Sequence, residues 1–433
     1  MSTMKLAING GEPVVPEGFK FKIWPEITKV DEDYVLSSLR NDNHAWGPNC
    51  VQLGKDWTEW NGNKFALATN SGTAALHMGL AACGVGPGDE VIMTTTSWTS
   101  TATSVLHHNG IPIFCDIDRD TILMDPKLIE ERITQKTKAI IVVHYWGLPC
   151  DMDPIMEIAK KYNLYVIEDA CQAHGALYKG KKVGLTGHCA AFSMNQNKNF
   201  CAGEGGLFVT DDEELLASAQ AVMNFGEMKA PEAHRDYHSY SLGWMYRMND
   251  LTAAFARAEL TKLTETNKQA VYNFNKIREG LKGLPGLMLP FNSDKQSTNG
   301  YAFIIRVQPD EAGIKADEGK FKDAVIDALK AEGVPVNSAR WLLPAHTIIQ
   351  AKNGYGKGCP WSCSHARQNI DYSLEQYPIS LKAVNTSIQI AINGHRPPNG
   401  EVETDYIIEG VRKVFENPDQ VLIPNTCYRE GQN

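Results

Sequence analysis

The chain has 433 residues, of which 43% are hydrophobic and 21% charged, and its formal net charge is −9. This length exceeds what one compact core normally supports, so we expect two domains. The basic residues are dispersed along the chain, without the basic stripe of a typical nucleic-acid-binding protein. No apolar run approaches the ~20 residues of a membrane-spanning helix, and the N-terminus lacks the features of a secretion signal. We therefore expect a cytoplasmic protein that binds neither nucleic acid nor membrane.

The ten cysteines show no repeating spacing, and several lie in apolar runs such as "IPIFCDID". This distribution is typical of reduced thiols rather than of a disulfide framework. Cys359 and Cys363, with His365 close by, offer residue types of a zinc site, but no second Cys or His pair completes a tetrahedral set. We expect no metal site.

Residues 64–210 alternate short apolar runs with helix-like segments. Runs this apolar, joined by helices, indicate a mostly parallel sheet with helices on both faces. The expected elements, in chain order, are a strand at 64–69, a helix at 71–84, a strand at 89–95, a helix at 97–110, strands at 111–117 and 139–147, a helix at 151–163, and strands at 164–170, 187–194 and 205–210.

A continuous helix is expected over residues 250–283, and the loop-rich stretch that follows it is a plausible domain boundary. We therefore expect an N-terminal segment and a large α/β domain at residues 1–283, and a smaller C-terminal α+β domain at residues 284–433. The smaller domain is indicated by two strands and one helix, at 301–307, 387–394 and 319–333.

Three short motifs carry candidate chemistry. The first, "NSGT", stands at a strand-to-helix junction, where Gly72 permits close approach and free N–H groups of the first helical turn can bind a phosphate. The second, "VIEDACQAHG", places Asp169 at the end of an apolar strand, where open α/β sheets usually bind ligands. The third, "FSMNQNKNFCAGEGG", surrounds Lys198 with amides and glycines, which indicate close packing rather than a solvated tip.

Each motif also has a purely structural interpretation. The first can cap a core helix, Asp169 can cap the next turn, and Lys198 can lie on a surface loop. Taken together, in this order and at sheet edges, they indicate a pyridoxal phosphate site. Such a site needs a phosphate cup, an acid for the pyridine nitrogen and an imine-forming lysine.

The motifs are part of a resemblance that covers nearly the whole chain. The sequence resembles the DegT/StrS-type aminotransferases, within the fold-type I pyridoxal phosphate enzymes. This resemblance rests on collinear motifs that include "LAINGGEPV", "TNSGTAALHMGLAACGVGPGDEVI", "VIEDACQAHGA", "FSMNQNKNFCAGEGG" and "YRMNDLTAAFARAEL". It implies a large domain with a mostly parallel sheet covered by helices, a smaller C-terminal α+β domain, and a homodimer with two active sites at the subunit interface.

The resemblance also assigns roles to individual residues. It makes Lys198 the residue that carries the cofactor as an imine, and Asp169 the partner of the pyridine nitrogen. On the residues alone, Trp98 is more typical of a core or interface position and Asn249 of a helix N-cap. The other implied cofactor contacts are phosphate binding by Gly72, Thr73 and Ser193, ring stacking by Trp98, a position near the phenolic side for Gln172, and a phosphate contact from the neighbouring subunit by Asn249.

Substrate contacts follow less directly from the motifs. Arg247 and Arg396 are candidates for the carboxylate of the amino donor, because a guanidinium can bind it bidentately, and either can equally be a structural ion-pair partner. Residues 195–197 are amides where many relatives that act on nucleotide-linked sugars have a His-Pro or Phe-Pro pair. This stretch resembles the branch that aminates keto-cyclitols or makes 3-amino-5-hydroxybenzoate. Lys198 argues against the branch that dehydrates keto-sugars with a histidine in place of the lysine.

We therefore expect a pyridoxal phosphate-dependent aminotransferase that moves an amino group from glutamate or glutamine to a ketone of a cyclitol or sugar. The expected setting is aminosugar or secondary-metabolite biosynthesis, including antibiotic biosynthesis. A dehydrating or cyclising lyase, a 3-amino-5-hydroxybenzoate synthase-like enzyme and a non-catalytic cofactor-binding partner subunit stay open as alternatives. Specificity is expected in loops at residues 225–245 and 337–365, and the sequence does not identify the ketone.

Overall fold

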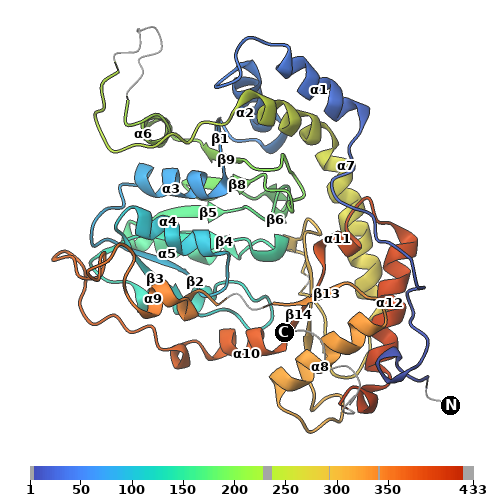
Figure 1. The fold of residues 1–433 in the computed structure, drawn as a ribbon. Helices are drawn as coiled ribbons and strands as arrows, with labels where there is room; N and C mark the ends of the chain where they lie inside the picture. Colours follow the sequence, from blue (N-terminus) through green and yellow to red (C-terminus); the bar gives the residue numbers. More distant parts are fainter. Residues whose placement is uncertain (1–3, 228–236, 292, 340–341, 423–433) are drawn as a thin grey trace.

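The computed structural model describes residues 4–227, 237–291, 293–339 and 342–422. A seven-stranded sheet lies at the centre of the larger part of the molecule (Figure 1), in the order β1-β9-β8-β5-β4-β2-β3. The central strands β8, β5, β4, β2 and β3 are parallel, whereas β9 is antiparallel to both β8 and β1. The expected mostly parallel sheet is confirmed. Its strands are Phe65–Thr69 (β1), Glu90–Thr94 (β2), Ile111–Cys115 (β3), Thr137–Val143 (β4), Tyr165–Asp169 (β5), Cys189–Ser193 (β8) and Gly206–Thr210 (β9).

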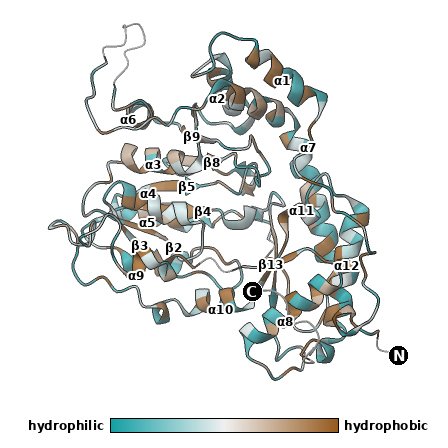
Figure 2. Cartoon of the chain, in the orientation of Figure 1, coloured by the Kyte–Doolittle hydropathy of each residue, from teal (hydrophilic) through white to brown (hydrophobic). Residues whose placement is uncertain are grey.

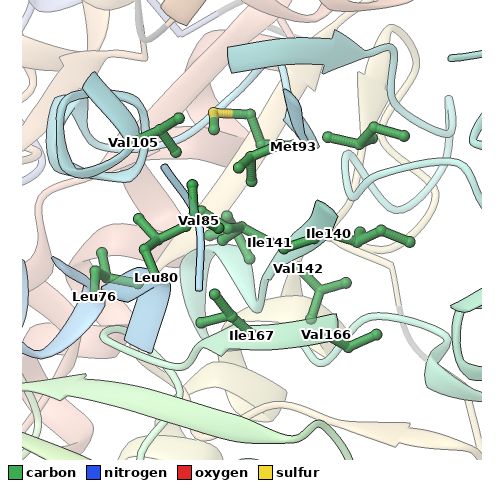
Figure 3. Close-up of a cluster of buried hydrophobic side chains, with 14 of the residues drawn as sticks. Leu76, Leu80, Val85, Met93, Val105, Ile140, Ile141, Val142, Val166 and Ile167 are labelled. Carbon is green, nitrogen blue, oxygen red and sulfur yellow. The ribbon is translucent and has the colours of Figure 1, made fainter. Parts of the chain in front are cut away.

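Helices cover both faces of this sheet because successive strand side chains point to opposite faces. On β9, Phe208 packs with one helix layer, while Leu207 and Val209 pack with the other. The first layer contains α3 (Gly72–Ala82), α4 (Thr99–His107) and α6 (Glu213–Met223); the second contains α2 (Pro48–Asn61) and the first half of α7 (Asp250–Gly280). Figure 2 shows apolar residues along the strands, and Figure 3 shows part of the core, including Leu76, Leu80, Met93, Val105, Ile141 and Ile167.

A smaller antiparallel sheet lies beside the second half of α7 (Figure 1), in the order β10-β12-β14-β13. Helices α8 and α12 pack against it and close a second core that contains Phe303, Val325, Ile388 and Val411. This arrangement has the expected α+β composition. The elements are Leu287–Met288 (β10), Phe303–Val307 (β12), Val336–Ser338 (β13), Ser387–Ile390 (β14), Glu318–Ala331 (α8) and Glu401–Phe415 (α12).

The division between residues 283 and 284 stays a prediction, and contacts cross it in both directions. Leu6 lies in the core of the small sheet, and the backbone N–H of Val15 donates to the carbonyl oxygen of Glu332 at 3.0 Å. Conversely, Leu343 and Tyr372 pack in the core of the large sheet. Segments on each side of this boundary therefore contribute to the core of the other sheet.

The remaining elements connect or flank the large and the small sheet. Helix α5 joins β4 to β5, and β11 pairs with β6 in a small three-stranded sheet. None of the helices within the described ranges is long and apolar enough to cross a membrane. The bounds are Lys29–Leu39 (α1), Met152–Tyr162 (α5), Thr347–Gln350 (α9), Pro378–Thr386 (α10), Ile392–His395 (α11), Leu177–Tyr178 (β6), Lys181–Lys182 (β7) and Gln296–Ser297 (β11).

Candidate active site

Asp169 is the last residue of β5, and its side chain is only 4% exposed. The hydroxyl of Thr101 donates to Asp169 Oδ2 at 2.8 Å, and the backbone N–H of Cys171 donates to Oδ1 at 3.3 Å. A buried carboxylate requires such donors, because removing a charge from water without partners is costly. The two hydrogen bonds hold the Asp169 carboxylate in one orientation at the edge of the sheet where the parallel strands end.

The start of α3, which follows β1 at the same edge, presents hydrogen-bond donors suited to a phosphate. The Ser71 hydroxyl accepts the N–H of Ala74 at 3.1 Å, and the N–H groups of Gly72 and Thr73 have no partner within the helix. A Cβ on Gly72 would lie 2.7 Å from the Cβ of Ser193, the last residue of β8. Glycine is therefore required for this close approach. Two backbone donors and the Ser193 hydroxyl are gathered at a helix N-terminus, a combination suited to a phosphate.

Lys198 lies in the turn between β8 and β9, at the same sheet edge. Its carbonyl oxygen accepts the indole N–H of Trp24 at 3.0 Å, and its Nζ donates to the Tyr301 hydroxyl at 3.5 Å. The turn is well packed, since neighbouring Asn199 is 2% exposed. Lys198 itself is half-buried, so it is neither sealed in the core nor on a solvated tip.

Cys171 links the acid to the start of α3, and its thiol also responds to the charge of Lys198. Burial raises its pKa well above the ordinary value, the charge of Asp169 adds to this increase, and the charge of Lys198 opposes it. A Cβ on Gly72 would lie 2.9 Å from the same sulfur atom. The acid and the start of α3 therefore contact the partly buried Cys171, the lysine lies at the same sheet edge, and the donor set fits a cofactor with a phosphate, a ring nitrogen and an aldehyde.

Two further predicted cofactor residues lie on segments adjoining Asp169. Gln172 is 8% exposed, and its Oε1 accepts the backbone N–H of Trp146 at 2.7 Å. Trp98 directly precedes α4 and is 58% exposed. Thr101, three residues beyond Trp98, carries the hydroxyl that binds Asp169. Stacking by Trp98 and the contact near the phenolic side by Gln172 stay predictions.

Arg396 lies beside the lysine. Its guanidinium is 1% exposed and donates to Asn199 Oδ1 at 2.6 Å. The Tyr301 ring centroid is 5.2 Å from both the Arg396 Cζ and the Lys198 Nζ. Burial lowers the pKa of Arg396 to about 10. The fold thus brings one of the two candidate arginines to the reactive amine.

Arg247 and Asn249 lie on the segment that leads into α7. Arg247 forms an isolated bridge with Thr69 at the end of β1, and its Cζ is 5.8 Å from the Phe225 ring centroid. The exposed Asn249 caps α7, because its Oδ1 accepts the backbone N–H of Thr252 at 2.9 Å. The capping interpretation is confirmed, whereas its contact with a second subunit stays a prediction.

Residues that the sequence analysis missed lie close to this site. Thr101 stands four residues after Ser97, a spacing that places both on one side of a helix start and could have signalled a joint role. Tyr301 and Trp24 carry no such local signal. Among the loops expected to set specificity, residues 228–236 and 340–341 lie outside the described residues. Within the described ranges, no group of three or more His, Cys, Asp or Glu side chains is arranged to hold a metal ion.

Comparison with known proteins identifies the family. The sequence model of the DegT/DnrJ/EryC1/StrS aminotransferase family matches residues 25–371. The chain belongs to this aminotransferase family. It is a pyridoxal phosphate-dependent aminotransferase of fold type I, and the resemblance seen in its motifs is confirmed.

Individual relatives of this aminotransferase extend over most of the chain. The spore coat polysaccharide biosynthesis protein SpsC of Bacillus subtilis strain 168 is 30% identical over 401 residues, which cover 91% of this chain and 97% of that protein. A Micromonospora echinospora protein assigned as an L-glutamine:3-amino-2,3-dideoxy-scyllo-inosose aminotransferase is 32% identical over 348 residues, or 79% and 81% of the two chains. The crystal structure of 3-amino-5-hydroxybenzoic acid synthase shares the fold, with a TM-score of 0.80 at 24% identity over 93% of this chain and 98% of that one.

Proposed function

We propose that this aminotransferase moves the amino group of glutamate or glutamine to a keto group on a cyclitol or sugar. The observation that carries the proposal is the grouping of Asp169, Lys198 and the start of α3 at one edge of the large sheet, where Cys171 contacts both Asp169 and the start of α3. The acceptor class is supported by two relatives, one named for polysaccharide biosynthesis and one for L-glutamine and an inosose.

The site offers a partner for each part of pyridoxal phosphate. Asp169 would face the ring nitrogen, and Lys198 would hold the cofactor covalently. These roles suit a buried, oriented carboxylate and a half-buried amine at one sheet edge. The remaining contacts would come from Gly72, Thr73 and Ser193 at the phosphate, Trp98 on the ring face, Gln172 near the phenolic oxygen, and Asn249 of the second subunit of a homodimer.

Bound pyridoxal phosphate supplies an electron-withdrawing ring that acidifies the Cα–H bond of the amino donor. The donor amine would first displace Lys198 from the cofactor, and the freed Nζ would then act as general base for this Cα proton and return a proton later in the cycle. Asp169, as a carboxylate, stabilises positive charge at the ring nitrogen. Arg396 is the better placed of the two arginines to bind the donor carboxylate, because it shares the Tyr301 ring with Lys198.

The amide-rich stretch next to Lys198 offers contacts to the acceptor. Asn195 Nδ2 donates to Glu204 Oε1 at 3.0 Å, and Gln196 Nε2 donates to the carbonyl oxygen of Trp24 at 3.1 Å. Asn197 is exposed. An amide both donates and accepts hydrogen bonds, so Asn197 would suit the hydroxyl groups of a polyol.

The test begins with the purified protein loaded with cofactor. Borohydride reduction and peptide mapping should place the label on Lys198. Glutamate or glutamine should convert the cofactor spectrum to its amino form, and a panel of keto-cyclitols and keto-sugars should reverse that conversion. A protein that binds the cofactor but shows no conversion with either donor would be a non-catalytic subunit. Release of a dehydrated or cyclised product without amino transfer would identify a lyase.

A further inference from the structure

Three buried side chains form a continuous series of hydrogen bonds behind the acid. Ser97, Thr101 and Asp169 are 2%, 0% and 4% exposed. Ser97 Oγ lies 2.8 Å from Thr101 Oγ1, and Thr101 Oγ1 lies 2.8 Å from Asp169 Oδ2. The series leads from the start of α4 to the end of β5.

Counting protons fixes the direction of both bonds. A carboxylate can only accept, so the single hydroxyl hydrogen of Thr101 is directed at Asp169. Ser97 must then donate to Thr101 Oγ1, because that hydroxyl has no second hydrogen to offer. Ser97 therefore determines where the Thr101 hydrogen points, and Thr101 determines how the carboxylate is turned.

These hydrogen bonds use part of the capacity of the Asp169 carboxylate to accept hydrogen bonds. Oδ2 accepts Thr101, and Oδ1 accepts the N–H of Cys171 at 3.3 Å. The Cys171 thiol also interacts with the carboxylate, and the lone pairs that these partners leave free can accept a ligand. The same short segment also contains Trp98, so a displacement of the start of α4 would affect the acid and the predicted stacking residue together.

We propose that Thr101 is a positioning residue for Asp169 and that Ser97 orients the Thr101 hydroxyl. The inference rests on the proposed function and deepens it, because Asp169 acts there on the ring nitrogen. Without the Thr101 donor, the carboxylate is less stabilised as an anion and competes more strongly for the ring proton. The ring then withdraws electrons less effectively, so amino transfer slows while the donor still binds.

The experiment compares four variants in the cofactor-loaded enzyme. Thr101→Val removes the donor, Thr101→Ser keeps a hydroxyl at the same position, and Ser97→Ala removes only the orienting group. Ser104→Ala is the matched control: Ser104 is equally buried on the same helix, but its hydroxyl donates to the backbone oxygen of Thr101 at 3.2 Å. The readouts are the absorption of the bound cofactor across pH without substrate, cofactor retention on dialysis, and kcat and KM for the donor.

Thr101→Val should lower kcat by about tenfold to a hundredfold, the size expected when one hydrogen bond to a buried charged group is lost. KM should stay within about twofold, and the pH at which the cofactor absorption changes should move. Ser97→Ala should show the same changes in smaller size, Thr101→Ser should restore the wild-type values, and Ser104→Ala should match the wild type.

The inference is overturned if Thr101→Val keeps the wild-type spectrum and kcat, or if Ser104→Ala reproduces its defects. An enzyme that binds the cofactor but transfers no amino group would contradict the proposed function. The substrate-free spectra of the Thr101 variants would still decide the role of Thr101 in that case.

Discussion

The hydroxyl of Tyr301 lies 3.5 Å from the amine nitrogen of Lys198, although 103 residues separate the two along the chain. Tyr301 is 5% exposed, and its backbone N–H donates to Asn299 Oδ1 at 3.1 Å. Asn299 Nδ2 in turn donates to the carbonyl oxygens of Gln172 and His174, at 3.1 and 3.2 Å. The loop after β5 therefore holds the residue that meets the lysine.

Replacing Tyr301 with phenylalanine should lower kcat by about tenfold and leave KM for the amino donor nearly unchanged. The hydroxyl holds Nζ near its reactive position, and a misplaced base transfers protons less efficiently. Steady-state kinetics with glutamate or glutamine measure the effect. Tyr272→Phe is the control, because the exposed Tyr272 hydroxyl donates to Glu401 Oε1 at 3.0 Å. An unchanged kcat in Tyr301→Phe would contradict this role.

Gly72→Ala should weaken cofactor binding and lower the free energy of unfolding by about 1–3 kcal/mol, the usual cost of overpacking. The added methyl group would lie 2.7 Å from the Ser193 Cβ and 2.9 Å from the Cys171 Sγ. Cofactor titration and urea unfolding measure the two effects. In the control Gly86→Ala, the nearest atom, Asp89 Oδ2, would be 3.9 Å away, so both values should stay close to wild type. Full cofactor affinity in Gly72→Ala would argue against a phosphate cup here.

Asn249 is expected to have two separable roles. Asn249→Ala should lose about 1 kcal/mol of stability, because α7 loses its cap, whereas Asn249→Ser keeps a capping oxygen. Both variants should bind the cofactor more weakly, because neither has the amide that is predicted to reach the phosphate. Thermal unfolding of the apo-protein and cofactor titration distinguish the roles. Wild-type cofactor affinity in Asn249→Ser would show that Asn249 caps α7 and does not bind the phosphate.

Mixed dimers test whether Asn249 acts across the subunit interface. Consider a dimer of one Lys198→Ala subunit and one Asn249→Ser subunit. If Asn249 acts in trans, the Asn249→Ser subunit has a native Lys198 and receives a native Asn249 from its Lys198→Ala partner, so the dimer contains one intact site. If Asn249 acts within its own subunit, no intact site remains. Cofactor affinity of the purified mixed dimer should therefore be native for half of the sites.

Glu259 should give stability an unusual pH dependence. The residue is 3% exposed, and burial raises its pKa to about 7 against the opposing influence of Lys262, whose Nζ forms an ion pair with Glu259 Oε1 at 2.6 Å. Between the unfolded pKa of roughly 4.3 and the folded value, the folded state binds more protons. The contribution of Glu259 to the free energy of unfolding therefore falls as pH rises, by up to about 1.4 kcal/mol per pH unit.

The Glu259→Gln variant removes this titration. Relative to the wild type, it should gain about 2 kcal/mol of stability as pH rises from 5 to 7. Urea unfolding of both proteins at several pH values measures the difference, which cancels titrations that the two proteins share, including those of the buried histidines. A difference that does not change with pH would show that Glu259 stays charged beside Lys262 and Asp31.

Much of the site could be predicted because its chemistry lies in short motifs at strand ends. Asp169 ends β5, Ser193 ends β8, and Gly72 follows β1. Parallel strands bring these ends to one edge, so the order of strands and motifs was enough to group them. Lys198 became a candidate through its unusual neighbours, the order of the other two motifs and the family resemblance taken together. The half-buried state of its side chain could not be predicted, because exposure depends on what packs over a loop.

The sequence by itself determined that a mostly parallel α/β sheet is followed by smaller α+β elements, and which residues lie at the edge of the large sheet. Apolar periodicity and helix starts depend on backbone geometry and on neighbours within a few positions, and these are present in any short stretch of the chain. Only the tertiary structure decided that Trp24 and Tyr301 contact Lys198, and that Arg396 lies against the same ring. Such contacts join residues 95 to 174 positions apart, and their geometry depends on how two separate cores pack together, which no local pattern encodes.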